Sequence, residues 1–422
     1  MELLKNILRV LAILTIKKYK PFIIGVTGTA GKTSTKNAIY AVLKSKYKVR
    51  MAGGNLNNEI GFPLAILGNY DHSGGAKFWL RVLVSSVKNL ILGISYPKIL
   101  ILEYGADRPG DIGYLLTIAK PDIAVVTAIG SVPVHIEFYK DKEELVKEKA
   151  KLVRALPKNG VAILNYDDPD VLEMQDGINC KVYTFGLESG AEIKISSFEN
   201  KIEFGKPIGI SFKLEAEGSF VPIKIKDIFG RGQAYAMAAA AALGIEKGIN
   251  LVDISDELSS YKGIPGRCRL INGIKDSYIL DDTYNASPIS MAESLKVLDD
   301  LKAPRRIAVL GDMLELGKYS SYVHEEIGKI IPGVANILVT VGPRSKFLAE
   351  SAKHNGFPEA NIYEFNNSDE AKGKVKDLIQ SQDLILVKGS QSMRMEKIVA
   401  EIMANPIEAH EVLVRQYGNW LK

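Results

Sequence analysis

The sequence predicts an α/β protein built from two doubly wound domains, and three observations lead to that fold class. Continuous apolar runs of strand length alternate with helical stretches along most of the chain, a pattern typical of parallel strands that are buried on both faces. Polar or glycine-bearing turns follow most of these runs. The length of 422 residues exceeds what one core holds and corresponds to about two or three domains.

Composition excludes several classes of protein. Hydrophobic residues make up 46% of the chain and charged residues 24%, which is ordinary for a soluble globular protein. The net charge of +5 comes without any long run of lysine or arginine, so nucleic acid is not an expected partner. Cys180 and Cys268 stand far apart with no second ligand at metal spacing, which argues against a disulfide framework and a zinc site. We therefore expect a reducing compartment and a cytoplasmic location.

Residues 1–20, MELLKNILRVLAILTIKKYK, are predicted to form one amphipathic helix. Apolar side chains recur at helical intervals at Leu3, Ile7, Leu11 and Leu14. The other surface is basic, through Lys5, Arg9, Lys17, Lys18 and Lys20. Because Lys5 and Arg9 interrupt the apolar run and no small-residue cleavage site follows, a signal peptide is not expected. We interpret the segment as a helix that packs on the next domain.

A second amphipathic stretch covers residues 78–93, FWLRVLVSSVKNLILG. Arg81 and Lys88 interrupt it, and it falls short of the ~18 apolar residues that a membrane-spanning helix needs. No bilayer-spanning segment is predicted. Two basic amphipathic helices in one chain leave peripheral contact with a membrane surface as an alternative interpretation.

The central domain is predicted over residues 21–264. Apolar runs at 22–28, 98–106 and 121–130 indicate buried strands of a mostly parallel sheet, each followed by a helical stretch. Alternating strands between Lys181 and Asp227 indicate a small antiparallel portion of the same domain. The alanine-rich segment AYAMAAAAALG is expected to form a closely packed helix.

A Rossmann-like C-terminal domain is predicted over residues 265–422. Gly263, Pro265 and Gly266 punctuate the boundary. Beyond it, the segments YILDDTYNASP, RRIAVLGDMLELG, ANILVTVG and DLILVKGS each end a strand in a polar or glycine-bearing turn. Because ligands of doubly wound sheets bind at the carboxyl ends of the strands, these turns form the expected binding edge.

Residues 24–35, IGVTGTAGKTST, almost fit the phosphate-binding loop G-x-x-x-x-G-K-[ST], but its first glycine would fall at Val26. A glycine-rich turn between a buried strand and a helix still offers backbone N–H groups and a positive helix end to phosphates. Lys32 adds a positive charge, and the hydroxyl of Thr33 suits a magnesium ion. We therefore predict a P-loop central domain. A tight turn that only contains Gly-Lys-Thr is the alternative.

Two further side chains fall at strand ends near this loop. Glu103 closes an apolar strand, where a buried carboxylate needs a metal ion or charged partners. His135 follows the next strand and is expected at the same edge of the sheet. Both are candidate metal ligands, with a solvated strand end and a structural histidine as the alternatives. Lys149 lies between Lys147 and Lys151 on a helix whose spacing by itself indicates a solvated, charged face.

The first strand of the second domain ends in a polar turn. Asp281 and Asp282 close the strand, and Asn285 follows. Such groups suit either a nucleotide or an amine-bearing substrate, and their spacing does not distinguish the two.

Taken together, these segments resemble the Mur ligase family, the ATP-dependent amide-forming enzymes of cell-wall precursor synthesis, with the folylpolyglutamate synthetases as more distant relatives. In that family the phosphate loop is T-G-T-x-G-K-[ST], and no glycine is expected at the position of Val26. The segments GGNLNNEIGFPLAIL, EYGADRPGDI, ILDDTYNASPISM, VLGDMLELG and VKGSQSMRMEKI are similar to the MurF-type subgroup, which adds D-alanyl-D-alanine. The motifs keep the family's order from residue 21 to about 400.

The resemblance implies that ATP phosphorylates a substrate carboxylate and that the amine of an amino acid or dipeptide attacks the acyl phosphate. It implies ATP and Mg²⁺ as cofactors and a muropeptide-type acceptor as partner. The implied catalytic residues are Lys32, Glu103, His135 and Lys149. The implied metal ligands are Thr33, Glu103, His135 and a carbamylated Lys149. The implied ATP-binding residues are Gly28, Thr29, Ala30, Gly31, Lys32, Thr33, Ser34, Arg267, Asp282 and Asn285. The implied substrate-binding residues are Asn57, Asn58, Lys388, Ser390 and Arg394.

The chain also departs from the family pattern. The phosphate loop starts at residue 24, so residues 1–20 are interpreted as the remnant of an N-terminal UDP-binding domain that the sequence lacks. Gly232 and Ala236 stand where the motif G-x-H-x-x-x-N carries His and Asn, which implies a lost contact on the adenosine side. Residues 78–96 are interpreted as an insertion. We therefore hypothesise a lipid-linked acceptor at a membrane surface, or a partner that supplies the missing domain.

Two other functions stay open. A non-catalytic or regulatory relative would also keep the loop while losing the residues replaced by Gly232 and Ala236. A folate-type glutamate ligase would share the loop too, although the segments DDTYNASP and GDMLELG favour the cell-wall subgroup.

Overall fold

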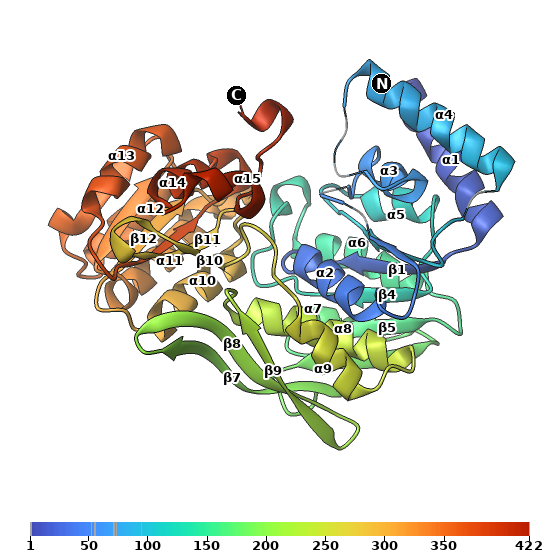
Figure 1. The fold of residues 1–422 in the computed structure, drawn as a ribbon, viewed down its shortest axis with the longest axis horizontal. Helices are drawn as coiled ribbons and strands as arrows, with labels where there is room; N and C mark the ends of the chain where they lie inside the picture. The colour runs from blue at the N-terminus through green and yellow to red at the C-terminus, as the bar shows by residue number, and fades with distance from the viewer. Residues whose placement is uncertain are drawn as a thin grey trace.

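The computed structural model describes residues 2–51, 53–54, 56–70, 72, 74–93 and 95–421. Met1 and Lys422, the outermost residues of the predicted segments 1–20 and 265–422, lie outside that part, as does Ile94 of the predicted insertion. Two sheets, each covered by helices on both faces, stand side by side, and a long antiparallel ribbon extends from the first (Figure 1). The predicted α/β fold class is confirmed.

The first sheet holds nine strands in the order β2-β3-β1-β4-β5-β6-β7-β8-β9. Their bounds are β1 (Phe22–Thr27), β2 (Val49–Met51), β3 (Ile99–Glu103), β4 (Ile123–Val126), β5 (Val161–Asn165), β6 (Lys181–Gly186), β7 (Ile193–Glu203), β8 (Lys206–Ala216) and β9 (Ser219–Lys226). Neighbouring strands are parallel from β2 to β7, and the pairs β7–β8 and β8–β9 are antiparallel. The antiparallel portion therefore begins later than Lys181, because β6 pairs with β5 and extends the parallel part.

Helices cover both faces of this sheet because strand side chains alternate between two apolar cores. Ile24 and Val26 point into one core, and Ile23 points into the other. The first core is covered by α2 (Lys32–Leu43), α8 (Arg231–Glu246) and α9 (Leu251–Ser259). The second is covered by α1 (Glu2–Tyr19), α3 (Gly61–Leu67), α4 (Ala76–Leu92), α5 (Asp111–Leu116), α6 (Lys142–Arg154) and α7 (Pro169–Leu172). The alanine-rich segment is the closely packed helix that was expected, since residues 238–242 of α8 are fully buried.

Helix α1 is present, but it is turned differently from the prediction. Leu3, Ile7 and Leu14 are exposed, and the buried face consists of Leu8, Leu11, Ala12 and Thr15. Lys5 and Arg9 face the body of the protein. Lys5 lies 2.5 Å from a carboxylate oxygen of Glu59, and Arg9 donates to the hydroxyl of Thr117 at 3.1 Å. The small and branched side chains of the buried face allow it to pack closely on α3. The stripe that contains Leu3, Ile7 and Leu14 therefore remains exposed.

The second sheet holds six strands in the order β10-β11-β15-β12-β13-β14, parallel except for the pair β10–β11. Their bounds are β10 (Arg269–Asn272), β11 (Tyr278–Asp282), β12 (Arg306–Gly311), β13 (Ile337–Val341), β14 (Ile362–Phe365) and β15 (Leu384–Lys388). The helices are α10 (Pro288–Asp300), α11 (Ser320–Val334), α12 (Ser345–His354), α13 (Ser368–Leu378), α14 (Glu396–Ile402) and α15 (Ala409–Val412). The first three pack on one face, and α13 and α14 pack on the other.

The chain passes from the first sheet to the second through residues 260–268, and two carboxylates of β11 hold this connection. The N–H of Gly266 donates to Asp281 at 3.0 Å, and the N–H of Cys268 donates to Asp282 at 3.1 Å. Gly266 has a φ of +68°, and an added Cβ would lie 2.8 Å from the backbone nitrogen of Tyr284. A glycine is therefore required where the connection approaches β11.

The buried Asp281 predicts a pH-dependent stability. Burial raises the pKa of its carboxyl group to about 6, compared with ~3.9 in an unfolded chain. Below the unfolded pKa the proton is bound in both states and the stabilising contribution is complete, and it is lost as the pH rises through the folded pKa. We expect the unfolding free energy of the unmodified chain, minus that of Asp281→Asn, to be about 2–3 kcal/mol larger near pH 4 than near pH 7. Urea unfolding at the two pH values measures it, and a constant difference would contradict the assignment.

Candidate active site

The predicted phosphate loop lies between β1 and α2, and its conformation depends on two glycines. Gly28 has a φ of +144°, and an added Cβ would lie 2.0 Å from Oγ1 of Thr127. The same hydroxyl donates to the carbonyl of Ala30 at 2.6 Å. Gly31 precedes α2 with a φ of +85°, and no side chain caps the helix there. The first N–H groups of α2 therefore lack intrahelical partners, which makes the helix end a suitable anion site.

Two lysine side chains converge on the carbonyl oxygen of Gly28. Nζ of Lys32 donates to it at 2.8 Å, and Nζ of the fully enclosed Lys149 donates to it at 3.2 Å. Burial lowers the pKa of Lys32. Burial, followed by the positive charge of Lys32, lowers the pKa of Lys149 to about 7. The spacing of Lys149 alone indicated a solvated face, and that prediction was wrong. The side chain is buried because α6 directs it toward the loop.

Glu103 ends β3 beside Val26 of β1 and is buried at 2% exposure. Its Oε1 accepts from the side-chain amide of Asn57 at 3.1 Å. Its Oε2 has no hydrogen-bond partner among the described residues and lies 3.6 Å from Nζ of Lys36. A buried carboxylate oxygen without a hydrogen bond is costly, and a bound cation would satisfy it.

Lys36 is a site residue that the sequence reasoning missed. It is buried at 1% exposure, and its Nζ also donates to the carbonyl of Gly54 at 3.2 Å. The pattern contained a signal for it, because Lys36 follows Lys32 by four residues and therefore shares its face of α2.

His135 adopts a left-handed conformation with a φ of +72° and connects the two halves of the molecule. Its Nε2 lies 3.3 Å from Oδ1 of Asp107, and its Nδ1 lies 3.0 Å from Oε2 of Glu315. The contact with His135 lowers the pKa of the Glu315 carboxyl group. Glu315 belongs to the GDMLELG turn after β12. It was not predicted as a site residue.

The loop forms one wall of a cavity of about 500 Å³ between the two halves. Predicted site residues from both halves line it, namely Thr29, Ala30, Gly31, Lys32, Thr33, Asn57, Asn58, Glu103, His135, Lys149, Arg267, Asn285 and Ser390. Within it, the Asn58 side chain accepts from the N–H groups of Ile60 and Gly61 at 3.2 and 2.8 Å, so it also shapes the start of α3. Ser390 accepts from the N–H of Leu314 at 2.9 Å.

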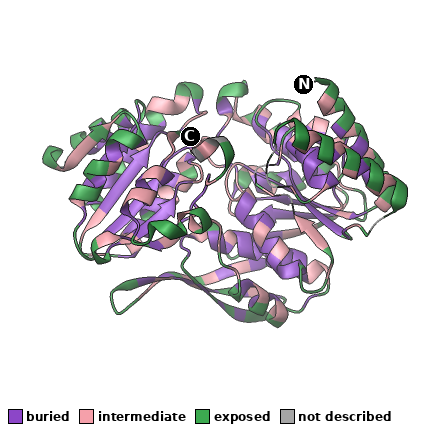
Figure 2. Ribbon diagram, turned by 45° about the horizontal axis from the view of Figure 1, so that its top comes forward, coloured by how far each residue is buried: buried purple, intermediate pink, exposed green. Residues whose placement is uncertain are grey.

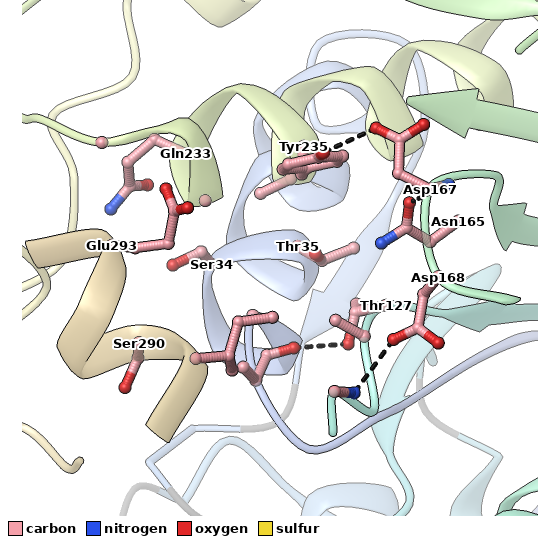
Figure 3. Close-up of a pocket in the computed structure, with 18 of the residues that line it drawn as sticks. Ser34, Thr35, Thr127, Asn165, Asp167, Asp168, Gln233, Tyr235, Ser290 and Glu293 are labelled. Carbon is pink, nitrogen blue, oxygen red and sulfur yellow. Dashed lines mark hydrogen bonds between the residues drawn. The ribbon is translucent and has the colours of Figure 1, made fainter. Parts of the chain in front are cut away.

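A second cavity of about 610 Å³ shares Ala30, Gly31, Arg267 and Ser290 with the first. Ser34 and Thr35 of α2 point into it, facing Asn165, Asp167 and Asp168 at the end of β5 and Tyr235 of α8 (Figure 3). The hydroxyl of Tyr235 donates to Asp167 at 2.6 Å, and Asp168 accepts from the N–H groups of Ile129 and Gly130 at 2.7 and 3.0 Å. These residues were not predicted as site residues, although the polar run after the apolar strand at 161–164 marks another carboxyl strand end.

Three of the other predicted residues are placed by ion pairs. Nζ of Lys388 lies 2.6 Å from Oδ2 of Asp282, and this buried pair lines the second cavity. Arg394 donates to Glu396 at 2.6 Å and is not among the residues that line either cavity, but its guanidinium lies 5.2 Å from the ring centre of Trp420, which lines the first cavity.

Gly232 and Ala236, the two departures from the family motif, line the second cavity. An added Cβ at Gly232 meets no atom within 4 Å. The missing side chain therefore leaves open space in the wall.

Arg267 lines both cavities. Its guanidinium donates to Oγ1 of Thr33 at 3.2 Å and stacks 4.0 Å from the centre of the Tyr284 ring. Its carbonyl accepts from the side chain of Gln233 at 2.9 Å. A residue of the connection between the two sheets thus contacts the first turn of α2 directly.

The residues that line the first cavity fit a magnesium site with few protein ligands. In the described ranges, no group of three or more His, Cys, Asp or Glu side chains gathers. The available ligands are instead the hydroxyl of Thr33 and the unsatisfied oxygen of Glu103, both oxygen donors of the kind that Mg²⁺ prefers.

Comparison with known proteins gives matches over most of the chain. The Mur ligase middle domain matches residues 26–80 and 84–244, and the glutamate ligase domain of Mur ligases matches residues 266–391. The UDP-N-acetylmuramoyl-tripeptide–D-alanyl-D-alanine ligase of Bacillus subtilis is 31% identical over 390 residues, which cover 91% of this chain and 76% of that protein. The crystal structure of MurF ligase from Thermotoga maritima in complex with ADP has a TM-score of 0.77 at 28% identity and covers 94% of this chain and 83% of that one.

A third comparison concerns the fold alone. Folylpolyglutamate synthase of Mycobacterium tuberculosis has a TM-score of 0.64 at 15% identity, with 93% of this chain and 94% of that one covered.

Gly28 in the loop and Gly232 at the start of α8 predict different effects of the same substitution. Gly28→Ala places a Cβ against Thr127 at a positive φ, and we expect a loss of about 1–3 kcal/mol of unfolding free energy. Gly232→Ala adds a methyl group in open space near the start of α8, and we expect no loss or a gain of up to about 1 kcal/mol. Thermal unfolding of both variants measures the difference, and equal destabilisation would show that the loop geometry is wrong.

Proposed function

Because the chain belongs to the Mur ligase family of ATP-dependent acid–amino acid ligases, we propose that it adds D-alanyl-D-alanine, or a similar amine, to a muropeptide-type carboxylate in cell-wall precursor synthesis. One observation carries the proposal: two cavities of ligand size meet at a single glycine-rich loop, and Lys32, Glu103 and Lys149 surround that loop. The two cavities share Ala30 and Gly31 of the loop together with Arg267 and Ser290, and Lys32, Glu103 and Lys149 line the 500 Å³ cavity beside them.

In this proposal the nucleoside of ATP occupies the 610 Å³ cavity and its phosphates lie on the N-terminus of α2. The acceptor carboxylate and the amine occupy the 500 Å³ cavity. The carboxylate attacks the terminal phosphorus, ADP leaves, and the amine then displaces phosphate from the acyl carbon. Lys32 offsets the negative charge that develops on the transferring group, which is the principal demand that phosphoryl transfer makes on a protein.

A magnesium ion held at the loop would supply positive charge that offsets the negative charge of the phosphates. Thr33 and Glu103 are the residues that we propose to hold it, and Arg267 keeps the Thr33 hydroxyl in place through its 3.2 Å contact. His135 and a carbamylated Lys149 are proposed to hold a second ion. A carbamate would replace a cation at Gly28 by an anion, so it reverses the local charge.

The two predicted domains have different proposed roles. We propose that residues 21–264 bind the nucleotide and that residues 265–422 close over it through Arg267, Asp282 and Asn285. The Asp282–Lys388 pair is buried against the second cavity, so Lys388 is proposed to act there by holding Asp282. Asn57 and Ser390, on opposite walls of the first cavity, are proposed to contact the acceptor and the amine.

The folate-type alternative rests on fold alone, since the folylpolyglutamate synthase structure is 15% identical. The D-alanyl-D-alanine ligase of B. subtilis is 31% identical, which favours the cell-wall substrate. The open space at Gly232 is the observation that favours the non-catalytic alternative, because a nucleotide contact is missing there.

The proposed activity predicts amine-dependent release of ADP and phosphate. D-alanyl-D-alanine together with a muropeptide acceptor is expected to give the largest release in a panel of amino acids and dipeptides. We expect Lys32→Ala to lower kcat by at least about 100-fold, because the developing charge loses its partner. Lys44→Ala, at the exposed far end of the same helix, is the matched control and should leave turnover unchanged.

The outcomes of this assay separate the three functions. Release that requires glutamate and a folate acceptor would identify the folate-type ligase. Nucleotide binding without release for any amine would identify the non-catalytic relative. Turnover that survives Lys32→Ala would overturn the proposed role of the loop.

Carbamylation of Lys149 predicts a detectable label. The pKa of about 7 keeps a large share of its amine neutral at neutral pH, and the neutral amine is the form that adds CO₂. In ¹³C-bicarbonate, NMR of the intact protein should show one carbamate signal that disappears in Lys149→Gln and persists in Lys147→Gln, an exposed neighbour on the same helix. A signal that persists in Lys149→Gln would assign the modification elsewhere.

A further inference from the structure

Helices α1 and α4 together present an apolar face that nothing else in the described part of the chain covers. The side chains of this face are Leu3, Ile7, Val10 and Leu14 of α1 and Leu80, Val84, Val87, Ile91 and Leu92 of α4. Each is between 37% and 74% exposed. We call this set the α1–α4 face. In Figure 2 the helices beside the N-terminus carry the exposed colour along their outer side.

The two stripes lie on neighbouring helices that are joined near their C-terminal ends. The hydroxyl of Tyr19 donates to the carbonyl of Asn89 at 2.6 Å, and Lys18 donates to the carbonyl of Leu90. The rings of Tyr19 and Tyr96 stack 4.5 Å apart. Figure 1 shows α1 and α4 side by side at one edge of the molecule.

Other side chains of α1 and α4 fix the α1–α4 face to the rest of the protein. Lys5 of α1 pairs with Glu59, and Val82 and Ser86 of α4 are buried. The apolar side chains therefore project from a fixed platform, and their exposure does not come from a loose chain end.

Basic residues border the face, and carboxylates are scarce. Of the charged side chains in the two helices, one is acidic, Glu2, and the exposed basic ones are Lys17, Lys18, Lys77, Arg81 and Lys88. Lys5 and Arg9 point toward the protein and do not contribute. The border thus attracts a negatively charged surface, while the centre of the face favours an apolar one.

We propose that the α1–α4 face binds the chain to a membrane surface that contains anionic lipids. Protein interfaces are enriched in aromatic residues, methionine and arginine at their centre, whereas this centre is aliphatic throughout. Two parallel aliphatic stripes with long basic side chains at the edge are typical of helices that lie in the lipid headgroup region. No helix within the described ranges is long and apolar enough to cross a bilayer, so the contact is peripheral.

The docking proposal does not depend on the ligase activity. If that proposed function also holds, a consequence follows for the acceptor. Glu59, which pairs with Lys5 of α1, directly follows Asn58 in the wall of the 500 Å³ cavity. Membrane docking would hold this wall close to the lipid surface, which suits an acceptor carried on a lipid.

Vesicle flotation of the full chain tests the proposal without any turnover. The chain should float with mixed phosphatidylcholine and phosphatidylglycerol vesicles and float less with phosphatidylcholine alone. Leu14→Glu combined with Val84→Glu, at side chains 45% and 59% exposed, should abolish binding. Val252→Glu combined with Ile407→Glu, at 61% and 82% exposure elsewhere, is the matched control and should bind normally.

The basic border has its own test. Each surface lysine contributes roughly fivefold to binding of an anionic membrane, so Lys17→Gln with Lys88→Gln should weaken binding by about 30-fold. Lys158→Gln with Lys224→Gln, both exposed and distant from the face, should leave it unchanged. Circular dichroism confirms that each variant is folded.

Three results would overturn the proposal. The first is that the unmodified chain binds neither kind of vesicle, and the second is that the Glu variants float as well as their controls. A chain that elutes as a dimer, and becomes monomeric in Leu14→Glu with Val84→Glu, would show that the face is an interface between copies instead.

Discussion

Two lysine side chains approach one backbone carbonyl, that of Gly28, and the rest of the site is arranged around that contact. The carbonyl is directed toward Lys32 and Lys149 because Gly28 adopts a φ of +144° against Thr127, a conformation that excludes a side chain. Enclosing two amines so close together is electrostatically unfavourable. A nucleotide phosphate or a carbamate at Lys149 would relieve that repulsion. The arrangement of the two amines therefore favours a negatively charged group at the loop.

Much of the fold could be predicted because it follows from strand patterning. Buried parallel strands need continuous apolar runs, and those runs are present in the sequence. The orientation of α1 could not be predicted in the same way. The helix has two apolar stripes, Leu3, Ile7 and Leu14 on one and Leu8, Leu11 and Ala12 on the other, and periodicity cannot choose between them. Close packing on α3 decides it, and that depends on side-chain volume across elements.

The candidate site residues also fall into those that the sequence could predict and those that it could not. Glu103 could be predicted as a candidate because a carboxylate at the end of an apolar strand is costly to bury without a partner. Lys149 could be predicted as a candidate only through the family resemblance, since the spacing of α6 indicated a solvated face. Lys36 and Glu315 were missed because their importance comes from a neighbouring element, Glu103 for the first and His135 for the second. Arg394 lies outside both cavities because its turn directs it to Glu396, a local pairing that the motif does not reveal, and its role stays a prediction.

The position of Arg267 has a thermodynamic consequence. It touches the first turn of α2, lines both cavities and directly follows Gly266 in the segment that connects the two sheets. A ligand in either cavity that repositions Arg267 would therefore change the wall of the other cavity. In that case the two binding events would be coupled, and by reciprocity each ligand would change the affinity for its counterpart by the same factor.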